Sequence, residues 1–366
     1  MTGKLLAEDI DLIARSIPDP EKLRGATVLV TGASGLIGSI AVRSLAAADR
    51  LFGLGLTIYA LARDRQRLER AAGPETDSLR FAVSPVEADP LPCPPADYVL
   101  HCAAPTASDY FCTKPVETAG TILHGTENIL KQVLRAGRTK KIVFLSSIEV
   151  YGEITEKIRV TEACQGPIDP LHVRSSYPMA KRMAECLCKS YWEEYRVPVV
   201  IARLTQTFGP GIAASDNRVF VQFAKSAMTG SDIVLHTDGR SAKPYIYTTD
   251  AITALFYLLL RGESGTAYNV ANEATFCTVR EMAELVSRLG EKPVNVSFDK
   301  GKGGIYPPDS FLDLDCSRLR DLGWRPEKGL ETMYRRLIGH LAETEATTDT
   351  ETMAATAAAT ANKNAL

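Results

Sequence analysis

The chain of 366 residues is long enough for one large domain or two ordinary ones with a substantial core. Its formal net charge of -2 offers no basic surface for nucleic acid or anionic lipid. No apolar run approaches the roughly 20 residues that span a bilayer, and acidic residues interrupt the N-terminal stretch where a signal peptide would be apolar. We therefore expect a cytoplasmic protein whose partners are small molecules or other protein chains.

Strand and helix patterns alternate along residues 25–205, after a short helical extension at residues 1–24. Apolar runs predict strands at 26–32, 56–62, 97–104, 140–147 and 197–204, and helical periodicity predicts helices at 36–48, 63–72, 115–137 and 177–195. This alternation is typical of an α/β protein with a Rossmann-type, doubly wound parallel sheet. Such sheets bind their ligands at the carboxyl ends of the strands.

The pattern loosens from about residue 206. Shorter helices are expected at 219–228, 250–260 and 279–289, between short apolar runs at 232–236 and 267–272. We interpret residues 206–341 as a smaller substrate-binding lobe that is interleaved with the first domain. Residues 342–366 are rich in alanine and threonine and lack large apolar side chains, which predicts a disordered tail, although alanine could support transient helix.

The string TGASGLIG at residues 31–38 links a predicted strand to a predicted helix. Its glycines Gly32, Gly35 and Gly38 allow a tight turn and close approach of the backbone to a pyrophosphate. The helix N-terminus then offers unpaired N–H groups to that anion. The other candidate cofactor contacts are Ser34, Leu36 and Ile37 in the same turn and Ala103 after the strand at 97–104. The alternative is a glycine-rich turn made only for packing.

The end of the strand at 56–62 bears on the choice of cofactor. A carboxylate there hydrogen-bonds the ribose 2′-hydroxyl of NAD, whereas an arginine accommodates the 2′-phosphate of NADP. Arg63 and Asp64 are adjacent at this position, and either could face the ribose. Both could also be solvated charges at a helix start, with Asp64 as the N-cap. NAD is the expected cofactor, and NADP is not excluded.

A serine, a tyrosine and a lysine form a predicted proton-relay centre. Ser146 and Ser147 end the apolar run at 140–147, and Tyr177 and Lys181 stand four apart at the start of a helix. A free tyrosine titrates near pH 10, so a tyrosinate base at neutral pH needs a shift of ~3 units, or about 4 kcal/mol. The ammonium group of Lys181 and a cationic nicotinamide ring could supply much of that free energy. The eight cysteines and five histidines show no metal-ligand spacing, so no metal site is expected. His101 and His124 are interpreted as packed or loop histidines rather than ligands.

The strings TGASGLIG, DYVLHCAA, SSIEVYG, YPMAK and ARLTQTFGPG, in this order, resemble the extended short-chain dehydrogenases/reductases. Their NAD-dependent epimerase/dehydratase branch modifies nucleotide sugars, and the resemblance runs from about residue 25 to residue 341. It implies a tightly held cofactor and oxidation of the sugar at C4. By position, Ser147 matches the family's catalytic hydroxyl, Tyr177 its base and Lys181 the partner of that base. Tyr177 and Lys181 are also expected to contact the cofactor, with Lys181 holding the nicotinamide ribose.

Several segments resemble the UDP-glucuronate decarboxylases within this family. The resemblance implies substrate contacts from Pro105 and Thr106 and from Arg174 and Arg218, and it makes Glu149 an auxiliary catalytic group. Ile148 replaces the aspartate that dehydratases use, which disfavours dehydration. Lys243 replaces a common arginine, and Gln206 a usual asparagine, so the substrate can differ from UDP-glucuronate. The alternatives are a solvated strand-end charge for Glu149 and surface ion pairs for the two arginines.

We therefore expect an enzyme that oxidises a nucleotide sugar to a 4-keto intermediate and then decarboxylates or epimerises it. The alternatives are a net NAD(P)H-dependent oxidoreductase of a non-sugar carbonyl or alcohol, and a non-catalytic dinucleotide-binding scaffold. The helix at 177–195 carries one apolar stripe of Met183, Leu187 and Tyr191 and another of Ala180, Ala184 and Cys188. Two apolar faces predict burial against the sheet and against a second subunit, hence a homodimer. An ordinary core helix is the alternative.

Overall fold

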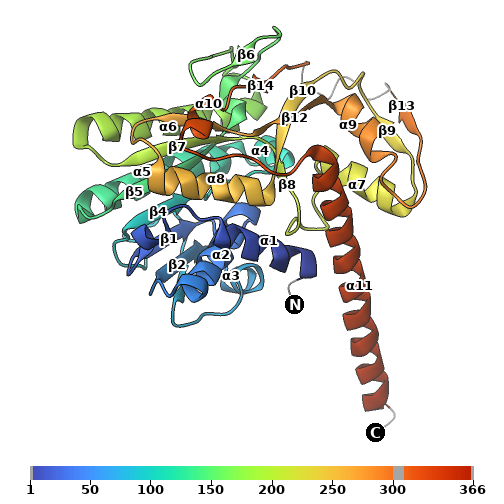
Figure 1. Ribbon diagram of the computed structural model, residues 1–366, viewed down its shortest axis with the longest axis horizontal. Coiled ribbons are helices and arrows are strands. Elements are labelled where there is room, and N and C mark those ends of the chain that lie inside the picture. The colour runs from blue at the N-terminus through green and yellow to red at the C-terminus, as the bar shows by residue number, and fades with distance from the viewer. Residues whose placement is uncertain (1–2, 300–308, 364–366) are drawn as a thin grey trace.

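A seven-stranded parallel sheet forms the centre of the molecule (Figure 1). The computed structural model describes residues 3–299 and 309–363. The strand order is β3-β2-β1-β4-β5-β7-β11, which confirms the doubly wound sheet. The strands are β1 (Thr27–Thr31), β2 (Thr57–Ala62), β3 (Leu79–Val83), β4 (Tyr98–His101), β5 (Lys141–Ser147), β7 (Val199–Leu204) and β11 (Ala267–Val270). Strand order reverses between β1 and β4, where sheets of this type leave a ligand-binding crevice at their carboxyl edge.

Helices cover both faces of this sheet. Side chains alternate along each strand, so that Val28 and Val30 of β1 enter one core and Leu29 enters the other. The first core is closed by α1 (Lys4–Arg15), α2 (Leu36–Phe52), α3 (Arg65–Ala72) and α8 (Thr248–Arg261). The second is closed by α4 (Ser108–Thr113), α5 (Pro115–Ala136) and α6 (Ser176–Tyr195). Because both faces are covered, the strands consist of nearly continuous apolar runs.

The remaining chain builds a smaller lobe with a core of its own. One sheet has the order β12-β10-β8, and a second pairs β13 with β9. The strands are β8 (Thr207–Phe208), β9 (Ile233–Leu235), β10 (Ala242–Tyr247), β12 (Asn272–Thr278) and β13 (Val296–Phe298), and the helices are α7 (Val219–Thr229), α9 (Val279–Val286) and α11 (Leu330–Lys363). The pair β6 (Arg159–Val160) and β14 (Asp313–Leu314) lies beside α10 (Ser317–Asp321).

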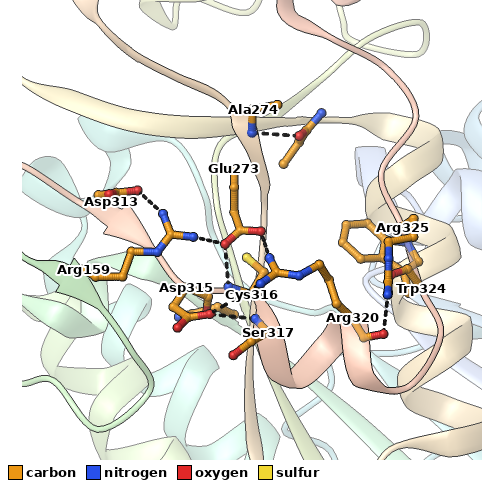
Figure 2. Close-up of polar contacts among 12 residues, drawn as sticks. Arg159, Glu273, Ala274, Asp313, Asp315, Cys316, Ser317, Arg320, Trp324 and Arg325 are labelled. Atoms are coloured by element: carbon orange, nitrogen blue, oxygen red, sulfur yellow. Dashed lines mark hydrogen bonds and ion pairs between the residues drawn. The ribbon is translucent and has the colours of Figure 1, made fainter.

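Figure 2 shows how charged side chains fasten this last pair of strands. Glu273 of β12 forms ion pairs with Arg159 of β6 and with Arg320 of α10. Arg159 also pairs with Asp313 of β14. Three segments that are distant in sequence are thereby tied together.

The structure differs from the sequence-based expectations in several places. Strand β3 was not expected, because the five-residue run LRFAV is short and the charged, exposed Arg80 interrupts it. Helix α8 and strand β11, expected in the lobe, pack with the central sheet, since β11 pairs in parallel with β7. Helix α11 continues to Lys363, through most of the segment whose composition predicts disorder, and alanine's high helix propensity accounts for it. Residues 364–366 lie outside the described residues.

The N-terminal helix α1 is part of the folded core. Its buried residues Leu6, Ile10, Ile13 and Ala14 join the core shared by α2 and α8. Its buried Asp9 accepts hydrogen bonds from the Tyr247 hydroxyl (2.6 Å) and from Arg336 of α11 (2.8 Å). No helix within the described ranges is long and apolar enough to cross a membrane.

We expect Asp250, at the start of α8, to make stability depend on pH. Burial raises the pKa of its carboxyl to about 6, although the backbone N–H of Lys328 donates to it. The folded state therefore holds this proton at pH values where the unfolded state has lost it, so stability falls as the pH rises from 3.8 through about 6. Asp250→Asn should remove up to about 3 kcal/mol of this decline. Urea unfolding across this pH range measures it.

The exposed Asp321→Asn variant is the control, and its unfolding free energy should follow that of the wild type. An unchanged pH dependence in Asp250→Asn would contradict the assignment.

Candidate active site

The turn between β1 and α2 brings the backbone into close contact with the end of β4. Gly32 has φ 65°, and a Cβ there would lie 2.8 Å from the backbone nitrogen of Ala103. A Cβ at Gly38 would clash with the Gly32 carbonyl. Gly35 is the N-cap residue of α2, so the first-turn amides of Leu36 and Ile37 open at this edge of the sheet. The arrangement fits a dinucleotide pyrophosphate, whose charge the helix N-terminus would stabilise.

A buried hydrogen-bond chain fixes this turn. The Thr126 hydroxyl donates to the Ile122 carbonyl (2.6 Å), so it accepts from Nε2 of His101 (3.2 Å). Nδ1 of His101 then accepts from the Thr31 hydroxyl (2.8 Å), which in turn accepts from the backbone N–H of Ala103 (3.1 Å). Burial, together with the charge of Lys181, lowers the pKa of His101 to about 3, so the ring is neutral. His101 is thus a packed, hydrogen-bonded histidine.

The end of β2 places Arg63 and Asp64 at the surface. Asp64 is the N-cap of α3, and its Oδ1 accepts from the backbone N–H of Arg67 at 2.9 Å. Arg63 precedes this cap and is exposed. One carboxylate oxygen of Asp64 is therefore committed to the helix.

The Ser147 hydroxyl lies close enough to the Tyr177 hydroxyl to lower the pKa of Tyr177. Ser147 ends β5 and caps the short helix η2 (Ile148–Tyr151), accepting from the backbone N–H of Glu149 at 3.2 Å. Ser146 faces the other way, and its hydroxyl donates to Glu185 at 2.5 Å. The alternation of side chains along a strand separates the two serines, so that Ser147 is the one beside Tyr177.

Tyr177 is held by packing on one side of its ring. Its ring stacks on Phe111 of α4 with centroids 4.2 Å apart and an interplanar angle of 8°. Burial raises the pKa of the Tyr177 hydroxyl well above its usual value, and the charge of Glu149 adds to this. The Ser147 hydrogen bond and the charge of Arg174 act in the opposite direction. Without further positive charge, Tyr177 is therefore a neutral phenol.

Lys181 lies one turn further along α6, on the same face as Tyr177. Its Nζ donates to the Leu145 carbonyl at 2.5 Å and lies 5.9 Å from the centroid of the Tyr177 ring. Burial lowers the pKa of Lys181 to about 8, so its charge is sensitive to neighbouring groups. The three residues expected from the sequence thus lie together.

A charged cluster adjoins this centre. The Nη2 of Arg174, from η3 (Val173–Ser175), contacts both carboxylate oxygens of Glu149 at 3.2 and 3.3 Å. Burial lowers the pKa of Lys243 on β10. The charge of Glu149 acts to raise this pKa, and the charge of Arg174 acts to lower it, so Lys243 interacts with both groups. The structure therefore brings Glu149, Arg174 and Lys243 to one place beside Tyr177.

The other expected substrate residues are more dispersed. Pro105 and Thr106 lie in the loop after β4. Gln206 follows β7, and its Oε1 is buried without a hydrogen-bond partner among the described residues. Arg218, the N-cap residue of α7, pairs with Asp216 (2.7 Å) rather than with the Glu149 cluster.

Two residues near the centre were not expected from the sequence. Phe111 stacks on Tyr177, and Glu185 stands one turn beyond Lys181. The i+4 spacing of Glu185 could have indicated it, whereas nothing local marks Phe111. Among the described residues, no group of three or more histidines, cysteines or acids could hold a metal ion, and all eight cysteines are free.

Comparison with known proteins identifies the family. The model of the NAD dependent epimerase/dehydratase family matches residues 28–271, more than half of the chain. The chain belongs to this family. It is accordingly an enzyme that uses a nicotinamide dinucleotide.

Similar proteins cover most of the chain. UDP-glucuronic acid decarboxylase 6 of Arabidopsis thaliana is 29% identical over 321 residues, which is 85% of this chain and 89% of that protein. The dTDP-D-glucose 4,6-dehydratase of Homo sapiens is 26% identical over 234 residues, 63% of this chain and 64% of that protein.

Solved structures share the fold of this family member. UDP-glucose 4-epimerase of Thermotoga maritima, solved with UDP-glucose, has a TM-score of 0.70 at 22% identity. The match covers 87% of this chain and 99% of the epimerase chain. An epimerase of Methanothermobacter thermautotrophicus has a TM-score of 0.75 at 22% identity, with coverages of 92% and 97%.

Proposed function

We propose that this enzyme oxidises a nucleotide-linked sugar acid at C4 and then decarboxylates it, with no net change in the cofactor. The observation that carries this proposal is the position of the Glu149, Arg174 and Lys243 cluster beside the Ser147–Tyr177 pair. A sugar carboxylate there would meet two cations and one carboxylate. The resemblance of 85% and 86% of the chain to two UDP-glucuronic acid decarboxylases supports the same substrate class.

The roles of the chain's own groups follow from their contacts. A nicotinamide cofactor held beside Tyr177 and Lys181 would supply both the acceptor and the later donor of the C4 hydride. Tyr177 takes the proton of the C4 hydroxyl, and Ser147 donates a hydrogen bond to the oxygen that becomes the ketone. The ionised form of Tyr177 needs positive charge to offset its burial, and Lys181 and the oxidised cofactor provide it.

The second step uses the ketone formed in the first. A carboxylate at C5 of the 4-keto sugar is a β-keto acid, so the C5–carboxylate bond breaks and its electron pair enters the C4–C5 enolate. Carbon dioxide leaves, and C5 takes a proton. Arg174 and Lys243 would orient the carboxylate, and Glu149 would position Arg174 and serve the proton transfer.

A panel of UDP-, dTDP-, CDP- and GDP-linked hexoses and uronates, with products followed by mass spectrometry, tests the proposal. We expect a uronate to lose one carbon dioxide without consumption of added cofactor. Isomerised hexoses would identify an epimerase instead, and stoichiometric use of added NAD(P)H a net oxidoreductase. Cofactor binding without turnover of any sugar would indicate a scaffold and contradict the proposal.

For the cofactor, we propose that the site accepts the 2′-phosphorylated form as well as NAD because of Arg63. Asp64 is engaged as the cap of α3, and Arg63 is exposed beside it. Arg63→Ala should weaken binding of NADP by roughly 10- to 100-fold, the worth of one or two charge-assisted hydrogen bonds. Calorimetric titration with each cofactor measures this.

Binding of NAD should be nearly unchanged in Arg63→Ala. The matched control is Arg67→Ala, on the exposed face of α3, which should leave both affinities unchanged. Equal loss for NAD and NADP in Arg63→Ala would contradict the proposed role.

We further propose a homodimer that forms through the outer face of α6. Ala180, Ala184 and Cys188 are buried against the sheet, whereas Met183 is 48% exposed. Met179 on the same helix is 38% exposed, so two methionines of α6 offer apolar surface that a second subunit would cover. Light scattering should give twice the 39.8 kDa chain mass, and a monomer would contradict the proposal.

A further inference from the structure

Helix α6 carries three ionisable groups in successive turns on one buried face. Tyr177, Lys181 and Glu185 stand four residues apart, and each is less than a tenth exposed. Tyr177 and Lys181 have roles in the proposed function, whereas Glu185 has none. A carboxylate is rarely buried without a partner, so its contacts indicate what it does.

The Glu185 carboxylate is held rigidly from two sides. Ser146 donates to its Oε1 at 2.5 Å. Arg203 of β7 donates through Nη2 at 2.7 Å and through Nε at 3.1 Å. The Arg203 and Glu185 side chains are 14% and 10% exposed, so solvent screens this pair little.

The charge of the Glu185 carboxylate stabilises the protonated form of Lys181. Burial lowers the pKa of Lys181 to about 8, and the groups that act against this are Cys102 after β4 and Glu185 and Cys188 on α6. Burial raises the pKa values of both thiols, so they are neutral near pH 7. His101 on β4 is neutral as well, and Arg203 on β7 is the cation that shares Glu185. Glu185 therefore supplies the negative charge that keeps Lys181 protonated.

The far side of the network reaches the segment that bears β6 and β14. Arg203 also donates to the Tyr151 hydroxyl at 3.2 Å, and that hydroxyl donates to Oδ1 of Asn269 at 2.6 Å. The Nδ2 of Asn269 donates to the carbonyls of Val160 (3.1 Å) and Asp315 (3.0 Å). Val160 belongs to β6, which Glu273 ties to α10 through ion pairs with Arg159 and Arg320 (Figure 2), and Asp315 directly follows β14. The Glu185 carboxylate is thus fixed relative to the central sheet and to the segment that bears β6 and β14.

We propose that Glu185 is a positioning residue that keeps Lys181 charged and directed at the Leu145 carbonyl, ready to bind the cofactor ribose and to stabilise ionised Tyr177. The stabilisation of ionised Tyr177 rests on the proposed function. The effect of Glu185 on cofactor binding holds for any substrate, because cofactor binding depends on the charge of Lys181 alone. A protonated Lys181 donates to the ribose hydroxyls, and a neutral one does so less strongly.

The test is the pH dependence of NADH binding, followed by the fluorescence of the bound reduced nicotinamide. In the wild type, affinity should fall as the pH rises through about 8, where Lys181 loses its proton. Glu185→Gln preserves the size of the side chain and one acceptor oxygen but removes the charge, and the pH midpoint of NADH binding should lie about one pH unit lower. Glu185→Asp, whose carboxylate is one methylene further away, should lie between the two.

Ser146→Ala is the matched control, because it removes a hydrogen bond to Glu185 but leaves the charge. Its midpoint should equal that of the wild type. A folded Glu185→Gln with the wild-type midpoint would overturn the proposal, and so would an equal shift in Ser146→Ala, which would indicate packing rather than charge. Should Glu185→Gln not fold, an unshifted midpoint in Glu185→Asp would overturn it. None of these outcomes depends on finding the sugar substrate, so they are distinct from a failure of the proposed function.

Discussion

Replacing Tyr177 with phenylalanine should lower kcat by roughly 10³-fold, the usual contribution of a positioned general base. The variant loses the hydroxyl that pairs with Ser147 and that would take the C4 proton. Its ring can still stack on Phe111 at 4.2 Å, so the fold should be retained. Steady-state turnover of the substrate found with the sugar panel measures the loss, and calorimetry should show that the cofactor still binds.

Tyr191→Phe is the matched control for this variant. Tyr191 lies on the same helix, is partly buried and packs near Tyr195 with ring centroids 5.6 Å apart. Its removal should leave kcat within about twofold of the wild type, since surface hydroxyls contribute little. Turnover that survives in Tyr177→Phe would refute the assignment of the base.

The second large effect is expected at Glu149. Glu149→Gln should slow the step after oxidation by roughly 10²- to 10³-fold, because Arg174 loses its charged partner and the proton transfer loses its carboxylate. Oxidation at C4 does not require this carboxylate. The variant should therefore accumulate reduced cofactor and the 4-keto sugar, which stopped-flow absorbance and mass spectrometry detect.

Glu153→Gln provides the comparison, since Glu153 is an exposed carboxylate four residues further along the chain. It should show neither accumulation nor loss of rate. If Glu149→Gln turned over at the wild-type rate, Glu149 would be a solvated strand-end charge. If it lost oxidation and the second step equally, its role would be structural.

Local pattern was sufficient to predict much of the fold and the centre of the site. Strands covered on both faces are continuous apolar runs, and the helices between them are periodic, so most of the central sheet could be read without pairing information. The i, i+4 spacing of Tyr177 and Lys181 is likewise local. Ser147 could be chosen over Ser146 only by resemblance, and the alternation of β5 now gives the physical reason.

Features that depend on long-range pairing could not be predicted. Helix α8 and strand β11 have ordinary patterns, and only the pairing of β11 with β7 places them in the first domain. Phe111 reaches Tyr177 from helix α4, more than 60 residues earlier in the sequence. The environment of Tyr177 also differs from the simple expectation, because burial, which raises its pKa, outweighs its polar neighbours.

The account depends on oxidation of the sugar at C4 with return of the same hydride. The direct test is turnover of a nucleotide-linked uronate that carries deuterium at C4, with unlabelled cofactor. We predict that the decarboxylated product retains the deuterium at C4 and that reduced cofactor appears only transiently, within the enzyme. Deuterium released to solvent, or transferred stoichiometrically to added cofactor, would contradict the account.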